Sequence, residues 1–356
     1  MLQTRLIKQI IICLCCLVVA NFVHAEPLRL LVPFFIGPKP LSPHVRTTIY
    51  FELSKAFRSY GSTDKGAWIL YGIEEMREPS HNAAIDAASW PSVHADLVIW
   101  GQVHRYDDGV AVQLFLTVTP IIKKRQVRPE LWTISAPKYN GEAYRVELDI
   151  PGRFYEFEPL ILTKDVVIQY EKPEGIPLYR SRQGGETIGF LGELFYFLEI
   201  HDDALRLRSD DTEGWVRTKN ISKGHSEAIT FAKGMVRLLR GDWKGSLESF
   251  SKVLENSNIP QNLRVHALIY SGLAKEKTDS SGMQEFEAAY RLNRLDKGAA
   301  SYLLMSRIMD IVRAKRQSDK TKLEVCVHKF KKDLKSVKVL FVNNDKWLQH
   351  IEDFLQ

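Results

Sequence analysis

The most constraining feature of this chain is the stretch ITFAKGMVRLLRGDWKGSLESFSKVLE, residues 229–255. Its first half places apolar residues three and four positions apart, which is the spacing of one buried helical face. Gly241 then ends the predicted helix, and Asp242 is suited to cap a second one, because its carboxylate can accept a backbone N–H. The second helix has an apolar stripe at Trp243, Leu247, Phe250 and Leu254. The stretch therefore predicts two short helices folded against each other.

Small residues allow these two helices to approach closely. Gly234 and Ser246 are twelve residues apart, and Phe250 follows Ser246 by four. This pattern resembles the tetratricopeptide (TPR) repeat, in which a Gly, a small residue and a Phe recur at these intervals; the family usually has Ala where this chain has Val253. A second, weaker copy has Gly272, Gly282, Phe286 and Ala289.

A repeat of about 34 residues needs neighbours to bury its apolar face. We therefore expect helices from Lys297 onward to supply a third pair or a cap. The resemblance implies that residues 223–356 form a TPR-like α-solenoid that binds partners. An ordinary helical hairpin is the alternative interpretation.

The first 25 residues have the arrangement of a signal peptide. Arg5 and Lys8 precede an apolar run at residues 10–23, and Val23 and Ala25 fill the small-residue positions before a cleavage site. The run is shorter than the roughly 20 residues of a membrane-spanning helix. We therefore expect a periplasmic protein, cleaved after Ala25 and without a transmembrane span; an uncleaved anchor is the alternative.

Charge and cysteine content narrow the classes of partner. Loss of the signal peptide lowers the formal net charge from +6 to +4, and this mild excess indicates no nucleic-acid partner. Three of the four cysteines leave with the signal peptide, so Cys326 has no partner for an internal disulfide. Stability is therefore expected to come from packed apolar cores.

The first part of the mature chain, residues 26–125, mixes strand and helix patterns. Apolar runs at residues 28–35 and 67–73 predict buried strands. Between them, Ser42 and Pro43 are suited to the N-cap and the first position of a helix.

The same part ends in a predicted hairpin. A short helix near residues 82–88 leads to the string ADLVIWGQVHRYDDGVAVQLFLTV, where Asp107, Asp108 and Gly109 supply a turn between two strands. Apolar residues alternate along the second strand at Val110, Val112, Leu114, Leu116 and Val118. The order strand, helix, strand, helix, strand, strand, with this string, resembles the amino-terminal domain of TolB and related envelope proteins. The resemblance implies a small α/β domain in an envelope setting and no chemistry.

The middle of the chain is rich in strand patterns. Residues 126–164 predict a strand-rich connecting region, which either extends the first sheet or bridges two domains. Residues 165–222 predict short strands separated by turns, with candidates in VVIQY, IPLYRS, TIGFLG, ELFYFLEI, ALRLRS and the closing GWVRT. The last segment resembles a bacterial SH3 domain, with Tyr179, Gly192 and the Gly214-Trp215-Val216 triplet in matching places. This resemblance implies an SH3-like β-barrel.

Candidate binding residues lie in this barrel-like segment. Arg180 and Arg182 beside Tyr179 indicate a solvated loop with a basic rim, suited to an acidic peptide or a cell-wall stem. Trp215 is instead expected in the core, because one large aromatic side chain is a sizeable share of a small domain's buried apolar area.

Several common catalytic motifs are missing from the sequence. It contains no Gly-Lys pair of a P-loop, no HExxH motif and no GxSxG motif. We therefore predict no catalytic residue, no cofactor and no metal site. The run His201, Asp202 and Asp203 is interpreted as a polar hairpin loop, because adjacent residues rarely converge on one ion.

These parts together predict a multidomain α+β protein of the bacterial cell envelope. The interpretation that the patterns favour is a non-enzymatic scaffold or adaptor that binds an envelope protein or peptide. One alternative is a peptidoglycan-binding protein whose SH3-like module recruits a partner enzyme. A hydrolase with an unrecognised site is the other.

Overall fold

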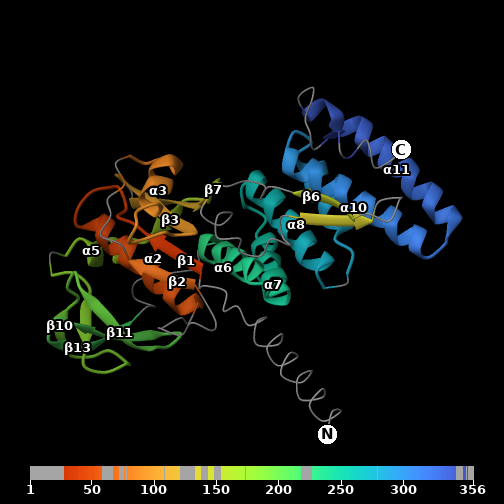
Figure 1. Cartoon of the computed structure of the whole chain (residues 1–356). Helices are drawn as coiled ribbons and strands as arrows, with labels where there is room; N and C mark the ends of the chain where they lie inside the picture. The colour runs from red at the N-terminus through yellow and green to blue at the C-terminus, as the bar shows by residue number, and fades with distance from the viewer. Residues whose placement is uncertain are drawn as a thin grey trace, which may run out of the picture.

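A computed structural model shows a mixed α+β protein with two main sheets and a helical carboxyl-terminal stretch (Figure 1). The structure describes residues 28–57, 67–71, 76, 78–107, 109–120, 133–137, 143–147, 154–172, 174–217, 227–278, 280–341, 348–349 and 351. The expected signal peptide, residues 1–25, lies outside the described residues. Within the described part, no helix has both the length and the apolar character needed to cross a membrane.

A six-stranded mixed sheet forms the amino-terminal region. Its strands are β1 (Leu28–Val32), β2 (Ala67–Tyr71), β3 (Leu97–Tyr106), β4 (Gly109–Val118), β7 (Phe154–Glu156) and β8 (Leu160–Leu162). The order is β2-β1-β3-β4-β7, and β8 also pairs with β4. β1 is parallel to β2 and to β3, whereas the pairs made by β4 are antiparallel.

Helices cover both faces of this sheet. α2 (Leu41–Phe57) follows β1, and α3 (His81–Ala88) follows β2. Because successive side chains of a strand point to opposite faces, Leu30 and Val32 lie in the core that contains α2, whereas Leu31 lies in the core under α3. The expected order through β4 is confirmed, and the five alternating apolar residues of β4 are buried.

α2 begins earlier than the sequence pattern indicates. Its first residue is Leu41, so Ser42 is already helical and the prediction of Ser42 as the N-cap is wrong. The Ser42 hydroxyl donates to the Gly37 carbonyl at 3.2 Å, and its backbone N–H donates to the Pro38 carbonyl at 2.9 Å. Ser42 therefore fastens the preceding loop to the helix instead of capping a helical N–H.

The connecting region takes part in two different sheets. β5 (Thr133–Pro137) and β6 (Ala143–Glu147) form a separate antiparallel pair, and β5 lies beside α10 (Lys297–Arg316). β7 and β8 instead pair with β4 and extend the first sheet. The expected extension of the first sheet is therefore confirmed for β7 and β8, whereas the β5–β6 pair lies outside that sheet.

The pattern VVIQY was predicted as a strand and is a helix, α5 (Lys164–Tyr170). Val166 and Tyr170, one helical turn apart, are its buried residues, while Ile168 is 61% exposed. Asp165 in the first turn also favours the helix dipole. The strand prediction is wrong because burial of Val166 and Tyr170, four residues apart, selects a helix for this short apolar run.

A five-stranded antiparallel sheet follows α5. Its strands are β9 (Pro177–Tyr179), β10 (Thr187–Phe190), β11 (Phe195–Ile200), β12 (Ala204–Ser209) and β13 (Thr212–Arg217). The order is β10-β9-β13-β12-β11, so the first strand pairs with the last. Among the described residues β10 and β11 remain edge strands, and the sheet is open.

Helices form the carboxyl-terminal stretch. They are α6 (Glu227–Leu239), α7 (Trp243–Glu255), α8 (Gln261–Glu276), α9 (Met283–Leu292), α10 and α11 (Lys320–Val337), followed by the 3-10 turn η3 (Lys338–Leu340). Each of these α-helices packs against the next one along the chain, from teal to blue in Figure 1. The expected helix from Lys297 is confirmed, as is Asp242 as the N-cap of α7.

Glycines sit opposite phenylalanine rings in two successive helical hairpins. A Cβ added to Gly234 would lie 2.8 Å from the Phe250 ring, and one added to Gly272 would lie 2.7 Å from the Phe286 ring. The Ser246 hydroxyl also donates to the Gly234 carbonyl at 3.1 Å. The small-residue spacing therefore marks places where the helices approach closely, as the sequence indicates.

The buried face of α7 differs from the predicted stripe. Phe250 is buried as expected, together with Ser246, Ser249 and Val253. The other members of the stripe are half-buried: Trp243, Leu247 and Leu254. Phe250 packs against Gly234 of α6, and the three half-buried side chains lie at the margin of the core.

Candidate binding face of the five-stranded sheet

Strand alternation gives the five-stranded sheet two chemically distinct faces. In ALRLRS, Leu205 and Leu207 are buried, whereas Arg206 and Arg208 alternate with them and point to the other side. In β13, Val216 is buried opposite Leu205. We call the side with these apolar residues the inner face and the side with the arginines the outer face.

The inner face packs against the α/β region. Phe195 and Phe197 of β11 approach Tyr50 of α2 with ring centroids 6.0 and 5.4 Å apart, and Phe51 lies beside the same two rings. Tyr71 of β2 joins this cluster at 5.3 Å from Phe195. The aromatic contacts hold the sheet on α2, so the outer face is turned away from that helix.

The outer face carries a row of aromatic and basic side chains. In the ladder Arg206 is opposite Trp215, and Trp215 is opposite Tyr179. Trp215 is half-buried, and its ring lies 5.7 Å from that of His201. The expectation that Trp215 fills the core is therefore wrong, because its neighbours Gly214 and Val216 occupy the inner face.

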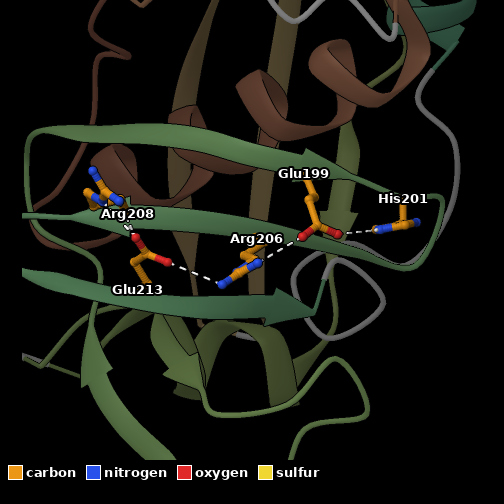
Figure 2. A network of polar contacts seen from close by, with 5 residues as sticks. All are labelled: Glu199, His201, Arg206, Arg208 and Glu213. Carbon is orange, nitrogen blue, oxygen red and sulfur yellow. Dashed lines mark hydrogen bonds and ion pairs between the residues drawn. The ribbon is translucent and has the colours of Figure 1, made fainter.

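Charged residues beside this row form one connected network (Figure 2). Arg206 bridges two carboxylates, with Nη1 2.9 Å from Glu199 Oε1 and Nη2 3.2 Å from Glu213 Oε2. Arg208 Nε donates to Glu213 Oε1 at 2.9 Å, and His201 Nε2 lies 3.2 Å from Glu199 Oε2. The network spans β11, β12 and β13 and fixes its charges relative to one another.

These ion pairs set the protonation of the carboxylates. The hydrogen bond from Arg206 is the main cause that lowers the pKa of Glu199, and the bond from Arg208 does the same for the pKa of Glu213. Both side chains therefore stay ionised at neutral pH. The network therefore presents fixed charges of both signs on the outer face.

The three binding residues predicted from the sequence are only partly brought together. Tyr179 is half-buried on the outer face, at the end of β9. Arg182 reaches the turn between β11 and β12, where its Nε donates to Asp203 Oδ1 at 3.0 Å. Arg180 pairs instead with Glu186 at 3.1 Å across its own loop. Each arginine of the expected basic rim thus has a carboxylate partner.

Sequence reasoning missed most of the outer face. Arg206, Glu199 and Glu213 were not singled out, and His201 was treated only as part of a polar turn, where the structure does place it. The alternation of Leu and Arg in ALRLRS was the available indication, since two residues of one strand face share their side of the sheet. Within the described residues, no cluster of His, Cys, Asp and Glu is arranged to hold a metal ion.

Comparison of the chain with models of known protein families, with curated proteins and with solved structures found no match. The geometry of this face is therefore the ground on which a function is proposed.

Proposed function

We propose that this protein is a non-enzymatic adaptor of the bacterial cell envelope, and that it binds a protein or peptide partner on the outer face of the five-stranded sheet. The main observation in support is the cross-strand row Arg206–Trp215–Tyr179, which places two half-buried aromatic rings beside an arginine on adjacent strands. Aromatic residues and arginine are the side chains enriched at binding hot spots. Their position on paired strands limits the entropy lost when a partner binds.

The domain types remain part of this proposal. Pairing of β9 with β13 brings the ends of the segment together, which supports an SH3-like module for residues 165–222. Sequential packing of α6 to α11 with repeated Gly–Phe contacts supports a TPR-like solenoid for residues 223–356, and solenoids present extended surfaces to partners. The strand and helix order of β1 to β4 supports a TolB-like domain.

Export to the periplasm is proposed from the amino-terminal pattern alone. Basic residues, an apolar run and a Val-His-Ala site occur in the order that signal peptidase recognises. The intact mass of the protein isolated from cells should match a chain that begins at Glu26. A chain that retains Met1 in the membrane fraction would instead indicate an anchor.

Site-specific photo-cross-linking in intact cells tests the binding face. A cross-linking amino acid at Tyr179 should trap one defined partner, and a second cross-linker at Tyr196, which is 67% exposed on the same face, should trap the same partner. The matched control is Val325 of α11, which is 49% exposed and lies outside the sheet. Arg206→Ala in the Tyr179 cross-linking variant should strongly reduce the yield.

The outcome against the proposal is equal trapping from all three positions, or a yield that Arg206→Ala leaves unchanged. Peptidoglycan is the second candidate ligand, favoured by the proposed SH3-like pairing of first and last strands. Sedimentation of the purified protein with cell-wall sacculi distinguishes the two. If no protein is cross-linked and Trp215→Ala abolishes binding to sacculi, the outer face binds the cell wall.

A further inference from the structure

α11 lies at one end of the helical stretch, where it packs on α10. Figure 1 shows this end far from the six-stranded sheet. Phe330 and Val337 are the fully buried residues of α11, and Leu323 is partly buried against the same core. These three residues are seven positions apart, which places them on one side of the helix. The opposite side of α11 is exposed.

The exposed side of α11 is rich in lysine. The helix has six lysines and no arginine, and all six lysines are exposed. They are Lys320, Lys322, Lys329, Lys331, Lys332 and Lys335. We call this set the lysine face. A helix with several basic residues on one side and apolar residues on the other is typical of contact with an anionic surface.

The acidic residues near this face are few, and most are engaged. Asp333 Oδ2 accepts a hydrogen bond from Arg307 Nε at 2.8 Å, on the side of α11 that meets α10. Asp319, at the N-cap, accepts the backbone N–H of Lys322. Glu324 is thus the one exposed carboxylate within α11. These acids do not neutralise the lysine face.

The lysines lie close to one another. Lys331 and Lys335 are four residues apart, and Lys332 is three residues before Lys335, so their side chains are neighbours on the helix surface. Within the part of the chain that the structure describes, none of these three side chains forms an ion pair. Like charges at this spacing repel and destabilise a helix. A negatively charged surface beside α11 would relieve the repulsion.

The positive excess remains when the residues outside the described ranges are counted. Residues 313–356 contain eleven Lys or Arg and six Asp or Glu. This count includes Asp345, Glu352 and Asp353, which lie outside the described residues. The segment therefore has an excess of five positive charges.

The types of exposed side chain indicate a diffuse anionic partner. Lysine carries a compact, hydrated charge on a flexible stem, whereas arginine binds a single carboxylate or phosphate through two parallel hydrogen bonds. Protein hot spots are enriched in Trp, Tyr and Arg, and single-stranded nucleic acids stack on aromatic rings. The exposed residues of α11, a helix that the structure describes in full, include no Arg, Trp, Tyr or Phe. A bilayer surface with many mobile headgroups fits this composition best.

We propose that the lysine face of α11 docks the protein on a bilayer that contains anionic lipids. The lysines lie toward the headgroups, while Phe330 and Val337 stay packed in the core. α11 has 18 residues, so at about 1.5 Å per residue it offers a contact about 27 Å long. Figure 1 shows the five-stranded sheet at the other end of the molecule, so this contact is separate from the outer face.

Co-sedimentation of the purified full chain with large unilamellar vesicles tests the proposal. The vesicles contain either phosphatidylcholine alone or phosphatidylcholine with about one-third phosphatidylglycerol. At physiological salt, binding to the anionic vesicles should be at least about tenfold stronger. Salt at about 1 M, which shortens the screening length to about 3 Å, should remove the difference. Equal binding to both kinds of vesicle at physiological salt would refute the contact.

Two triple variants locate the contact on the molecule. The test variant replaces three lysines of α11: Lys331→Gln, Lys332→Gln and Lys335→Gln. The control replaces three exposed lysines of other elements and loops: Lys164→Gln, Lys172→Gln and Lys244→Gln. The α11 variant should bind anionic vesicles about a hundredfold more weakly, about fivefold for each lysine, and the control should bind as the unchanged chain does. Equal losses would show that net charge, and not α11, causes binding.

Glu324→Gln gives the opposite prediction. Loss of the exposed carboxylate from α11 should strengthen binding to anionic vesicles by about two- to fivefold. Every residue changed in these variants is exposed, so the melting temperature should stay close to that of the unchanged chain. Weaker or unchanged binding by Glu324→Gln would contradict docking through this side of α11.

A duplex oligonucleotide and an acidic polysaccharide distinguish a bilayer from other polyanions. At physiological salt, and at equal concentrations of negative charge, each polymer should bind the chain more weakly than the anionic vesicles do. Stronger binding of either polymer, lost in the α11 triple variant, would overturn the assignment of α11 to a bilayer.

Discussion

Phe250 and Trp215 show how neighbouring residues decide what a large aromatic side chain does. Phe250 is fully buried because Gly234, on the facing helix, leaves room for its ring. Trp215 is half-buried because Gly214 and Val216 take the inner face of the strand, which leaves the indole on the outer face. The Phe250 ring thus fills the core, whereas the Trp215 ring forms part of the outer face.

Replacement of Phe250 by Ala should lower the free energy of unfolding by about 3–5 kcal/mol, because the ring leaves a cavity among buried neighbours. Phe231 and Tyr270 lie 5.3 and 5.4 Å from it, centroid to centroid. Urea unfolding followed by circular dichroism measures the loss. Val325→Ala, at an exposed site of α11, should change stability by less than about 0.5 kcal/mol; similar losses in both variants would contradict this packing.

Truncation of a side chain on the inner face of the five-stranded sheet should destabilise the protein more than truncation on the outer face. Leu207→Ala should lower the free energy of unfolding by about 2–5 kcal/mol, since Leu207 is fully buried on the inner face. Trp215→Ala should cost about 1 kcal/mol, because a half-buried side chain loses less apolar contact. Denaturant titration of both variants makes the comparison. If Trp215→Ala lowers the free energy of unfolding as much as Leu207→Ala does, the indole of Trp215 belongs to the core.

At the level of elements, end residues explain where helices begin more reliably than composition does. Asp242, Asp296 and Asp319 each accept a backbone N–H three residues ahead, at the starts of α7, α10 and α11. These caps can be read from short-range spacing because the acceptor and donor are neighbours in the chain. The same reasoning gives the wrong result for Ser42, because its hydroxyl donates to a carbonyl in the loop before α2.

Asp242→Ala should therefore lower the free energy of unfolding by about 0.5–2 kcal/mol, since Asp242 Oδ1 accepts the Gly245 N–H at 2.9 Å. Asp242→Asn keeps the oxygen acceptor and should cost only a few tenths of a kcal/mol. Urea unfolding distinguishes the two variants. Equal losses would show that the charge, and not the cap, stabilises α7.

The whole molecule is joined by tyrosines as well as by apolar contacts. The hydroxyls of Tyr155 in β7 and Tyr270 in α8 lie 2.5 Å apart in a buried pair that links the first sheet to the helical stretch. Tyr170 of α5 likewise bonds Thr48 of α2 at 2.5 Å. Burial is the main cause that raises the pKa of Tyr155, Tyr270 and Tyr170.

This arrangement predicts a loss of stability at alkaline pH. A buried tyrosine with a raised pKa keeps its proton in the folded protein, whereas the same residue in the unfolded chain titrates near pH 10. The free energy of unfolding is therefore unaffected by this tyrosine below about pH 10. Above that value it falls by about 1.4 kcal/mol per pH unit for each such tyrosine. Urea unfolding between pH 8 and pH 11.5 measures this slope.

Tyr155→Phe should reduce the alkaline loss of the free energy of unfolding by about 1.4 kcal/mol per pH unit, the contribution of one buried tyrosine. Tyr106→Phe is the matched control, because Tyr106 is 61% exposed and should leave the slope unchanged. A slope that responds equally to both substitutions would show that the buried pair is not the cause.

Local pattern was sufficient for much of the fold. The alternation in β4, the turn at Asp107 and the Gly–Phe spacing of the helical hairpins involve residues close in the chain, and the structure has each of them. VVIQY was misassigned because a short apolar run fits both a strand and a helix, and only the burial of Val166 and Tyr170 against the rest of the protein selects the helix.

Long-range contacts decided the remainder. Residues 154–162 join the first sheet because their backbone groups pair with β4, which lies 37 to 52 residues earlier in the chain. The outer-face row from Arg206 to Tyr179 brings together side chains from three strands, and no local spacing encodes those contacts. Amino-acid pattern controls which conformations a segment prefers, whereas burial and backbone pairing between distant segments select one of them and create the sites.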